Sequence, residues 1–254
     1  MLFWISARFG WRALFVLIGA MGMAFALAWW VLYHDPPISG SHGRNSTPIS
    51  WKQLRGLLRS RRIWGASLGQ FGGNSTLVFF LTWFPSYLAK QRNMDSYHAG
   101  VFTAVPYLAA AAGVILGGWA SDAVLQRTGS RNLARKVPIV FGLFGASTII
   151  LADSVRGNLA MTAIFSLAFF CQGMTGLGWA VVADIAPSDL AGLTGGIFNF
   201  AANVAGVLTP IVIGGIIAAT GSFHYALAYI GGAALLGAGS YVFLLGDIER
   251  IVLD

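Results

Sequence analysis

Seven uncharged apolar stretches constrain what this chain can fold into more than any other feature of its sequence. Six reach the length of about 20 helical residues needed to cross the hydrocarbon core of a membrane, and one is shorter. They cover Ala13–Tyr33, Ile63–Leu88, Ala99–Ala120, Val137–Ala152, Leu159–Val182, Leu193–Ala219 and Tyr225–Leu245. Helices that are apolar on every side are typical of lipid or of a tightly packed bundle. We therefore predict an all-α polytopic membrane protein with seven transmembrane helices.

The composition and the placement of charge agree with this fold class. Charged residues make up 10% of the 254 residues and hydrophobic residues 56%, whereas soluble domains contain about 25% charged residues. The net charge of +7 is better explained by basic cytoplasmic loops than by nucleic-acid binding. With the N-terminus outside, the inner segments carry eleven of the 16 Lys and Arg residues and the outer segments five. We expect an N-out, C-in topology in a lipid bilayer and no nucleic-acid partner.

The longest polar segment divides the chain into three parts. We expect residues 1–33 to form one transmembrane helix that ends an N-terminal bundle. Residues 34–62 are expected to form a cytoplasmic linker, and residues 63–254 a six-helix bundle. The beginning of the sequence lacks the basic region and the cleavage site of a signal peptide. It is typical of the middle of a longer polypeptide, so we expect further N-terminal helices.

The second half of the linker has the pattern of an amphipathic helix. Trp51, Leu54 and Leu58 share one face through i, i+3, i+4 spacing. Another face carries the bases Lys52, Arg55, Arg59 and Arg62. Such a helix would lie among the anionic lipid headgroups of the cytoplasmic leaflet, and a solvated linker helix is the alternative.

Two of the apolar stretches contain a glutamine followed by clustered glycines. One runs from Gln70 to Asn74 and the other from Gln172 to Gly178. Because glycine costs a helix about 1 kcal/mol relative to alanine, such clusters indicate an opened or closely approached helix. Transporters built from inverted three-helix repeats place their binding sites at interrupted helices of this kind. The alternative is that the glycines only permit close packing.

Amide and aromatic side chains form stripes at similar depth on three of the stretches, through i, i+4 spacing. An amide in hydrocarbon needs partners, because an unpaired polar group costs several kcal/mol. Such stripes suit a ligand rich in hydroxyl groups, with an indole as a platform, whereas hydrogen bonds that only join helices are the alternative. The candidate substrate-binding residues are Gln70, Asn74, Gln172, Thr175, Trp179, Asn199 and Asn203.

The stretches lack the groups that other functions would need. All nine acids and all 16 bases fall outside them, so the chain offers no carboxylate for proton coupling and no cation for an anionic substrate at membrane depth. Cys171 is the only cysteine, which excludes an intramolecular disulfide and a cysteine-based metal site. We expect no cofactor, no metal site and no enzymatic activity, since no catalytic or phosphate-binding motif occurs.

Several motifs carry a resemblance to a known family. Gly118 and Asp122, followed by Arg127 and Arg131, form a G-x-x-x-D loop motif with trailing bases that resembles that of the major facilitator superfamily. Its carboxylate would brace helix ends and its bases would hold cytoplasmic phosphate. Four further strings occur in order: FFLTWFP at 79–85, GWAVVADIAP at 178–187, GLTGGIFN at 192–199 and TGSF at 220–223. Together they resemble the sugar-acid permeases of the anion:cation symporter family, such as galactonate and glucarate transporters.

The resemblance implies that Ala13–Tyr33 is the sixth helix of a twelve-helix transporter and that the other stretches are helices seven to twelve. It implies a bacterial inner-membrane symporter for sugar acids or other organic anions, coupled to protons and working by alternating access. The first five helices would then be missing here. By match of motif, Gln70, Trp179 and Asn199 would contact substrate. The alternatives are a non-transporting seven-helix assembly or sensory partner and, more remotely, a membrane enzyme.

Overall fold

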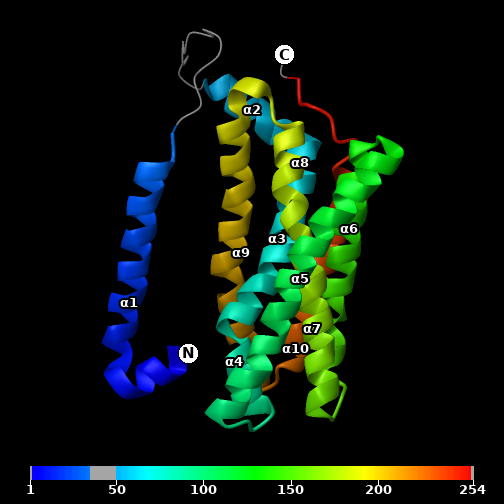
Figure 1. Cartoon of the computed structure of the whole chain (residues 1–254). Coiled ribbons are helices and arrows are strands. Elements are labelled where there is room, and N and C mark those ends of the chain that lie inside the picture. The colour runs from blue at the N-terminus through cyan, green and yellow to red at the C-terminus, as the bar shows by residue number, and fades with distance from the viewer. Residues whose placement is uncertain (1, 35–49, 253–254) are drawn as a thin grey trace. The chain divides into compact units, whose positions relative to one another are not determined.

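The computed structural model describes residues 2–34 and 50–252, and within these ranges the chain folds into helices without β-strands. Its helices are long and lie roughly along one another in the main bundle (Figure 1). The chain divides into two compact units, residues 1–48 and residues 49–254. The first part of the expected linker, residues 35–49, lies outside the described residues.

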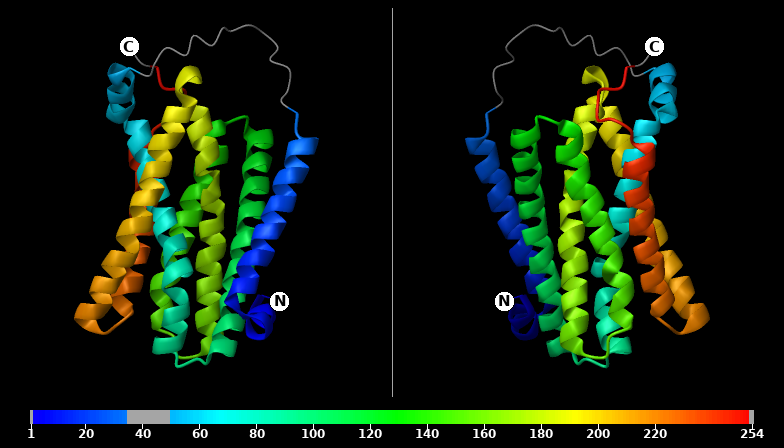
Figure 2. Two further views of the ribbon diagram at one scale, coloured as in Figure 1. Left: turned by 90° about the vertical axis from the view of Figure 1, so that its left-hand side faces the viewer. Right: turned by 90° about the vertical axis from the view of Figure 1, so that its right-hand side faces the viewer.

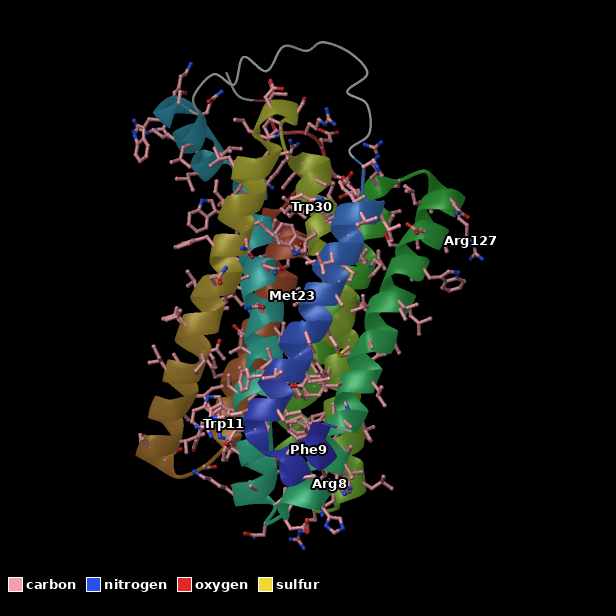
Figure 3. All side chains as sticks on the ribbon, turned by 60° about the vertical axis from the view of Figure 1, so that its left-hand side comes forward. Arg8, Phe9, Trp11, Met23, Trp30 and Arg127 are labelled. Carbon is pink, nitrogen blue, oxygen red and sulfur yellow. The ribbon has the colours of Figure 1, made fainter. Side chains whose placement is uncertain are left out.

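The first unit contains one helix, α1 (Leu2–Leu32). Gly10 interrupts it with φ 79° and ψ 165°, a conformation that glycine adopts readily because it has no Cβ atom. Figure 3 shows Arg8 and Phe9 before this kink, and Trp11, Met23 and Trp30 along the straight part that follows. The segment Arg8–Leu32 is long and apolar enough to cross a membrane, as the first apolar stretch predicts.

The second unit is a helical bundle, seen from two sides in Figure 2. Its elements are α2 (Trp51–Arg59), α3 (Arg61–Thr82), α4 (Phe84–Gln91), α5 (Ser96–Thr128), α6 (Arg131–Ala146), η1 (Ser147–Asp153), α7 (Asn158–Met174), η2 (Thr175–Leu177), α8 (Gly178–Ile185), η3 (Ser188–Leu190), α9 (Ala191–Thr220), α10 (His224–Gly239) and η4 (Ser240–Leu244). The elements η1 to η3 are 3₁₀ helices and η4 is a π-helix.

Among the described residues, six helical segments are long and apolar enough to cross a membrane, and α3 provides a further candidate. It is 22 residues long, but Gln70, Asn74 and its glycines make it less apolar than the others. The prediction of one continuous span over Ile63–Leu88 is wrong in detail, because α3 ends at Thr82 and α4 begins at Phe84. Pro85 occupies the first turn of α4, where its missing N–H costs nothing.

The shortest stretch was correctly counted as a span, but its helix is longer than the apolar stretch itself. The helical segment around Val137–Ala152 runs from Arg131 to Asp153, through α6 and η1. Arg131 therefore lies inside a helix, although the charge pattern predicted a loop there. Ser130 caps this helix by accepting a hydrogen bond from the N–H of Leu133. The capped start and the continuation into a 3₁₀ turn lengthen the span to 23 residues.

An aromatic cluster holds one end of the bundle together. Phe79, Phe80, Phe84, Phe165 and Phe169 are all buried. The rings of Phe80 and Phe169 stack with centroids 3.9 Å apart, and Phe165 packs against the other three. Since buried aromatic side chains contribute large apolar areas, this cluster fixes α3 and α4 against α7.

Glycines bring helix backbones into direct contact elsewhere in the bundle. The carbonyl oxygen of Phe170 on α7 occupies the place where Gly113 of α5 would carry a Cβ atom. Gly145 of α6 likewise leaves room for the side chain of Cys171, which is buried. Small residues at such crossings let transmembrane helices approach closely.

Candidate functional site

Gln70 and Asn74 project from α3 toward different neighbours. The carboxamide of Asn74 donates a hydrogen bond of 2.6 Å to the carbonyl oxygen of Ala202 on α9. Gln70 is half-buried and faces α8 instead, because a Cβ atom added to Gly178 would lie 3.4 Å from Gln70 Oε1. Among the described residues, the carboxamide of Gln70 makes no hydrogen bond. Asn74 therefore joins two helices, while Gln70 keeps its donors and acceptors available.

Gln172 and Thr175 lie where the chain passes from α7 into η2. Gln172 Nε2 donates to the carbonyl oxygen of Gly73 over 3.3 Å, and the Thr175 hydroxyl donates to the carbonyl oxygen of Gln172 over 2.7 Å. Thr175 is buried, and its Oγ1 would lie 2.9 Å from a Cβ atom on Gly73. The glycine cluster of α3 thus allows Gln172 and Thr175 to pack closely against the backbone of α3. The cluster at 172–178 contains a real interruption, since residues 175–177 are 3₁₀.

Trp179 and Asn199 lie on exposed parts of α8 and α9. Trp179 is 50% exposed, and its indole meets the ring of Phe198 edge-on with centroids 5.1 Å apart. Gly195 lies beside the indole, and an added Cβ atom would meet it at the ordinary contact distance of 3.6 Å. Asn199 is exposed, and its carboxamide has no hydrogen-bond partner among the described residues. Both side chains are therefore free to contact a ligand.

Asn203 is exposed one turn further along α9. Its Nδ2 donates a hydrogen bond of 2.9 Å to the carbonyl oxygen of Asn199 in the same helix. This bond occupies one donor of the carboxamide and leaves its oxygen open. Asn203 continues the polar edge that begins at Asn199.

These side chains come from elements that touch one another. The helices α3, α8 and α9 make contacts in all three pairs (Figure 1). Apart from Asn203, which is both exposed and bonded to its own helix, the predicted residues divide into two kinds. Asn74, Gln172 and Thr175 are hydrogen-bonded to the backbone of the bundle, whereas Gln70, Trp179 and Asn199 present unpaired or half-exposed groups. Tyr241, which the sequence did not suggest, borders the site, because its hydroxyl would lie 3.5 Å from a Cβ atom on Gly178.

The predicted loop motif is helical rather than a loop. Gly118 and Asp122 lie within α5, Arg127 lies in its last turn, and Arg131 is the first residue of α6. Gly129, with φ 65°, ends α5 in a left-handed conformation that favours glycine. Figure 3 shows the side chain of Arg127 extending away from the ribbon. The expected loop therefore shrinks to two residues.

A different set of residues braces the helices at this end. Arg135 of α6 donates to the hydroxyl of Ser121 on α5 over 2.9 Å and to Asp184 Oδ2 on α8 over 3.3 Å. Ser121 is fully buried, whereas its neighbour Asp122 is exposed. The sequence had not suggested these three residues. The signal that could have suggested the brace is Asp184 in the string GWAVVADIAP, at the same predicted end of the spans as Arg135.

The described residues include no group of three or more His, Cys, Asp or Glu side chains that could hold a metal ion. The chemistry that the site can offer is therefore hydrogen bonding from carboxamides beside an indole surface. Such groups recognise hydroxyl and carboxylate oxygens without carrying charge themselves.

Comparison with known proteins places this arrangement in context. The chain is 37% identical to the probable galactarate/D-glucarate transporter GudP of Escherichia coli (strain K12), over 98% of this chain and 61% of that protein. It is 35% identical to the D-galactonate transporter of Escherichia coli O6:H1, over 99% and 63%. It is 30% identical to the hexuronate transporter of Bacillus subtilis (strain 168), over 92% and 58%.

The chain thus spans about three fifths of the length of these relatives. Residues 3–210, which include α1 and most of the bundle, match the profile of the Major Facilitator Superfamily. The match covers well over half of the chain, and the helical architecture agrees with it. This chain is a multi-pass membrane protein that belongs to the Major Facilitator Superfamily.

Proposed function

We propose that this chain forms one side of a transport path for sugar acids or related organic anions. The observation that carries the proposal is the pair of unpaired carboxamides, Gln70 and Asn199, on helices that also present the half-exposed indole of Trp179. Polar groups without partners are costly at membrane depth. A water-filled path with a hydroxylated substrate removes that cost. The names of the similar transporters support the substrate class.

In this proposal each group has a separate task. The carboxamides of Gln70 and Asn199 donate to and accept from substrate hydroxyl and carboxylate oxygens. The indole of Trp179 packs against the carbon chain. Asn74, Gln172, Thr175 and Asn203 complete the polar surface or hold its helices in place. The spans carry no charged residue at their centres, so the groups that balance the substrate's charge and bind the coupling proton belong to a second bundle.

The proposed cycle is alternating access, in which two bundles rock against each other around the central site. Uptake is driven by symport with protons. The protein lies in a bacterial inner membrane with the N-terminus of this chain outside and its C-terminus inside, as the excess of inner Lys and Arg residues favours. A protonophore that dissipates the proton gradient is expected to abolish accumulation, and accumulation that persists unchanged would contradict proton coupling.

Uptake of radiolabelled D-glucarate by cells tests the site. The chain is produced together with the N-terminal bundle of a similar glucarate transporter, and the amount of protein in the membrane is measured in parallel. Gln70→Ala and Asn199→Ala are each expected to lower uptake per molecule by roughly tenfold, which corresponds to the loss of a hydrogen bond worth about 1.4 kcal/mol. Leu208→Ala, at an exposed position on the side of α9 opposite to Asn199, is the control and is expected to leave uptake unchanged.

The same experiment distinguishes the site from a packing role. Asn74→Ala removes the hydrogen bond to α9 and is expected to lower the amount of folded protein in the membrane. If Gln70→Ala and Asn199→Ala also lower only the amount of protein, with uptake per molecule unchanged, their carboxamides hold helices together and the proposal is wrong.

A further inference from the structure

An apolar groove of about 250 Å³ runs between α3 and α9 at the end of the bundle where α3 begins. Apart from Ser67 its lining is apolar. The hydroxyl of Ser67 is buried without a hydrogen-bond partner in the described structure. The lining consists of Leu58, Ile63, Trp64, Ser67, Leu68, Phe71, Ile197, Phe200, Ala201 and Val204. Because both helices belong to the membrane-spanning bundle, the groove is suited to a hydrocarbon chain.

The short helix α2 contributes Leu58 to the lining of this groove. A capping box starts α2, with Ser50 and Gln53 each accepting a backbone N–H from the other's position. Leu57 is fully buried, which anchors α2 to the bundle, while Trp51 is 77% exposed. The indole N–H of Trp64 donates to the carbonyl oxygen of Leu58 over 2.8 Å, so the corner between α2 and α3 is fixed. Exposed indoles at such a corner are typical of the membrane interface.

The bases of α2 are available to an anion. Lys52, Arg55 and Arg59 are exposed and line a cavity of about 830 Å³ that contains one acid, Asp189. In the part of the chain that the structure describes, none of these three bases forms an ion pair. The neighbouring Arg62 differs, because it bonds to Glu249 and to the carbonyl oxygens of residues 249 and 250.

From this juxtaposition we infer that α2 and the α3–α9 groove form a binding site for an anionic phospholipid. One acyl chain lies in the groove, and the phosphate group lies against Arg55 and Arg59. The position of Arg55 favours this ligand over a soluble anion. Arg55 lines the cavity and Leu58 lines the groove, and residues three apart are neighbours on the surface of a helix. A basic segment near the membrane gains about 1 kcal/mol for each Lys or Arg that meets anionic lipid.

Lipid retention by the purified chain of 254 residues tests this inference. The chain is exchanged into detergent containing equal amounts of phosphatidylglycerol and phosphatidylcholine, and the bound lipids are counted by native mass spectrometry. Arg55→Gln/Arg59→Gln is expected to reduce bound phosphatidylglycerol by about fivefold for each base removed. The control Lys90→Gln/Arg156→Gln removes the same charge from the opposite predicted side and is expected to retain wild-type binding.

A second pair of variants tests the groove independently of charge. Ala201→Trp fills the groove and is expected to reduce retention of phosphatidylglycerol severalfold. Val207→Trp adds the same side chain at an exposed position of α9 outside the groove and is expected to have no effect. Circular dichroism confirms that each variant is folded.

Three results would overturn the inference. They are wild-type retention in Arg55→Gln/Arg59→Gln, an equal loss in the charge control, and an equal effect of the two tryptophan variants. Displacement of the lipid by millimolar inorganic phosphate would assign the bases to a soluble anion instead. The inference does not depend on transport, so a failure of the uptake experiment would not contradict it.

Discussion

At the scale of single residues, glycines determine how closely the helices of this bundle pack. Gly113 faces the backbone of α7, whereas Gly118, five residues later on α5, has no neighbouring atom within 4 Å of an added Cβ. The two glycines look alike in the sequence. Their different surroundings make them a matched pair for measuring what close helix contact contributes.

Gly113→Ala is expected to lower the free energy of unfolding by roughly 1–3 kcal/mol, because the added methyl group overlaps the carbonyl oxygen of Phe170 and forces α5 from α7. Gly118→Ala is expected to be neutral or to stabilise by about 0.5–1 kcal/mol through helix propensity. Thermal unfolding in detergent measures both. Equal effects of the two substitutions would show that contact with α7 is not what Gly113 provides.

The candidate site shows which contacts of Gln70 and Asn74 can be predicted from residue spacing and which cannot. The i, i+4 spacing predicted that Gln70 and Asn74 share one face of α3. It did not separate their contacts, because Asn74 bonds to the backbone of Ala202 and Gln70 approaches Gly178. Both partners lie more than a hundred residues away in sequence. Tertiary packing therefore decides which of the two carboxamides bonds to a neighbouring helix and which remains available to a ligand.

At the scale of elements, Arg92 fastens α4 to the turn between η1 and α7. Its guanidinium donates to the carbonyl oxygens of Ala152 over 2.9 Å and Val155 over 2.8 Å, and to the hydroxyl of Tyr87 over 3.2 Å. These carbonyl groups lie at the end of a helical segment, where they lack partners within the helix. The side chain of Arg92 thus bonds to the carbonyl groups at the end of η1 and holds α4 against them.

Arg92→Met keeps much of the side-chain length but removes every hydrogen bond of the guanidinium. It is expected to lower the free energy of unfolding by roughly 1.5–3 kcal/mol, since hydrogen bonds from charged groups are among the stronger ones. Lys90→Met, at an exposed position two residues earlier, is the control and is expected to change stability by no more than about 0.5 kcal/mol. Comparable losses in both variants would contradict the role assigned to Arg92.

The sequence predicts where helices occur better than it predicts the residues at which they begin and end. Each apolar stretch corresponds to helical structure, because the need to bond every backbone group in lipid leaves little choice. The ends depend on local chemistry that hydropathy ignores. Ser130 starts α6 ahead of its three bases, and the chain turns at Trp83 before Pro85. Charged residues inside helix ends were therefore mistaken for loop residues.

At the scale of the whole molecule, the chain consists of two compact units. The second unit contains both buried hydrophobic clusters, one around Phe80 and one around Tyr241. Its two ends are braced separately, by Arg135 with Asp184 and by Arg92. A unit that has its own hydrophobic core, and whose helices are joined to one another at both ends, has the properties of an independently stable domain.

A shortened chain that begins at Ile49 is therefore expected to fold. Its thermal unfolding midpoint in detergent should lie within about 5 °C of that of the full chain, since a change of 1 kcal/mol moves the midpoint of a domain this size by roughly 2–4 °C. Size-exclusion chromatography checks that it remains monodisperse. Aggregation, or loss of the cooperative transition, would show that residues 1–48 are required for the fold of the bundle.

Because Cys171 is buried, the unmodified chain should react very little with a thiol-labelling reagent. Its sulfur lies against Gly145 inside the bundle, out of reach of a membrane-impermeant maleimide. Cysteines introduced as Arg156→Cys and Lys52→Cys then report the sidedness of the membrane directly. With the expected topology, intact cells label the first at once and the second only after permeabilisation, and the reverse order would invert the orientation.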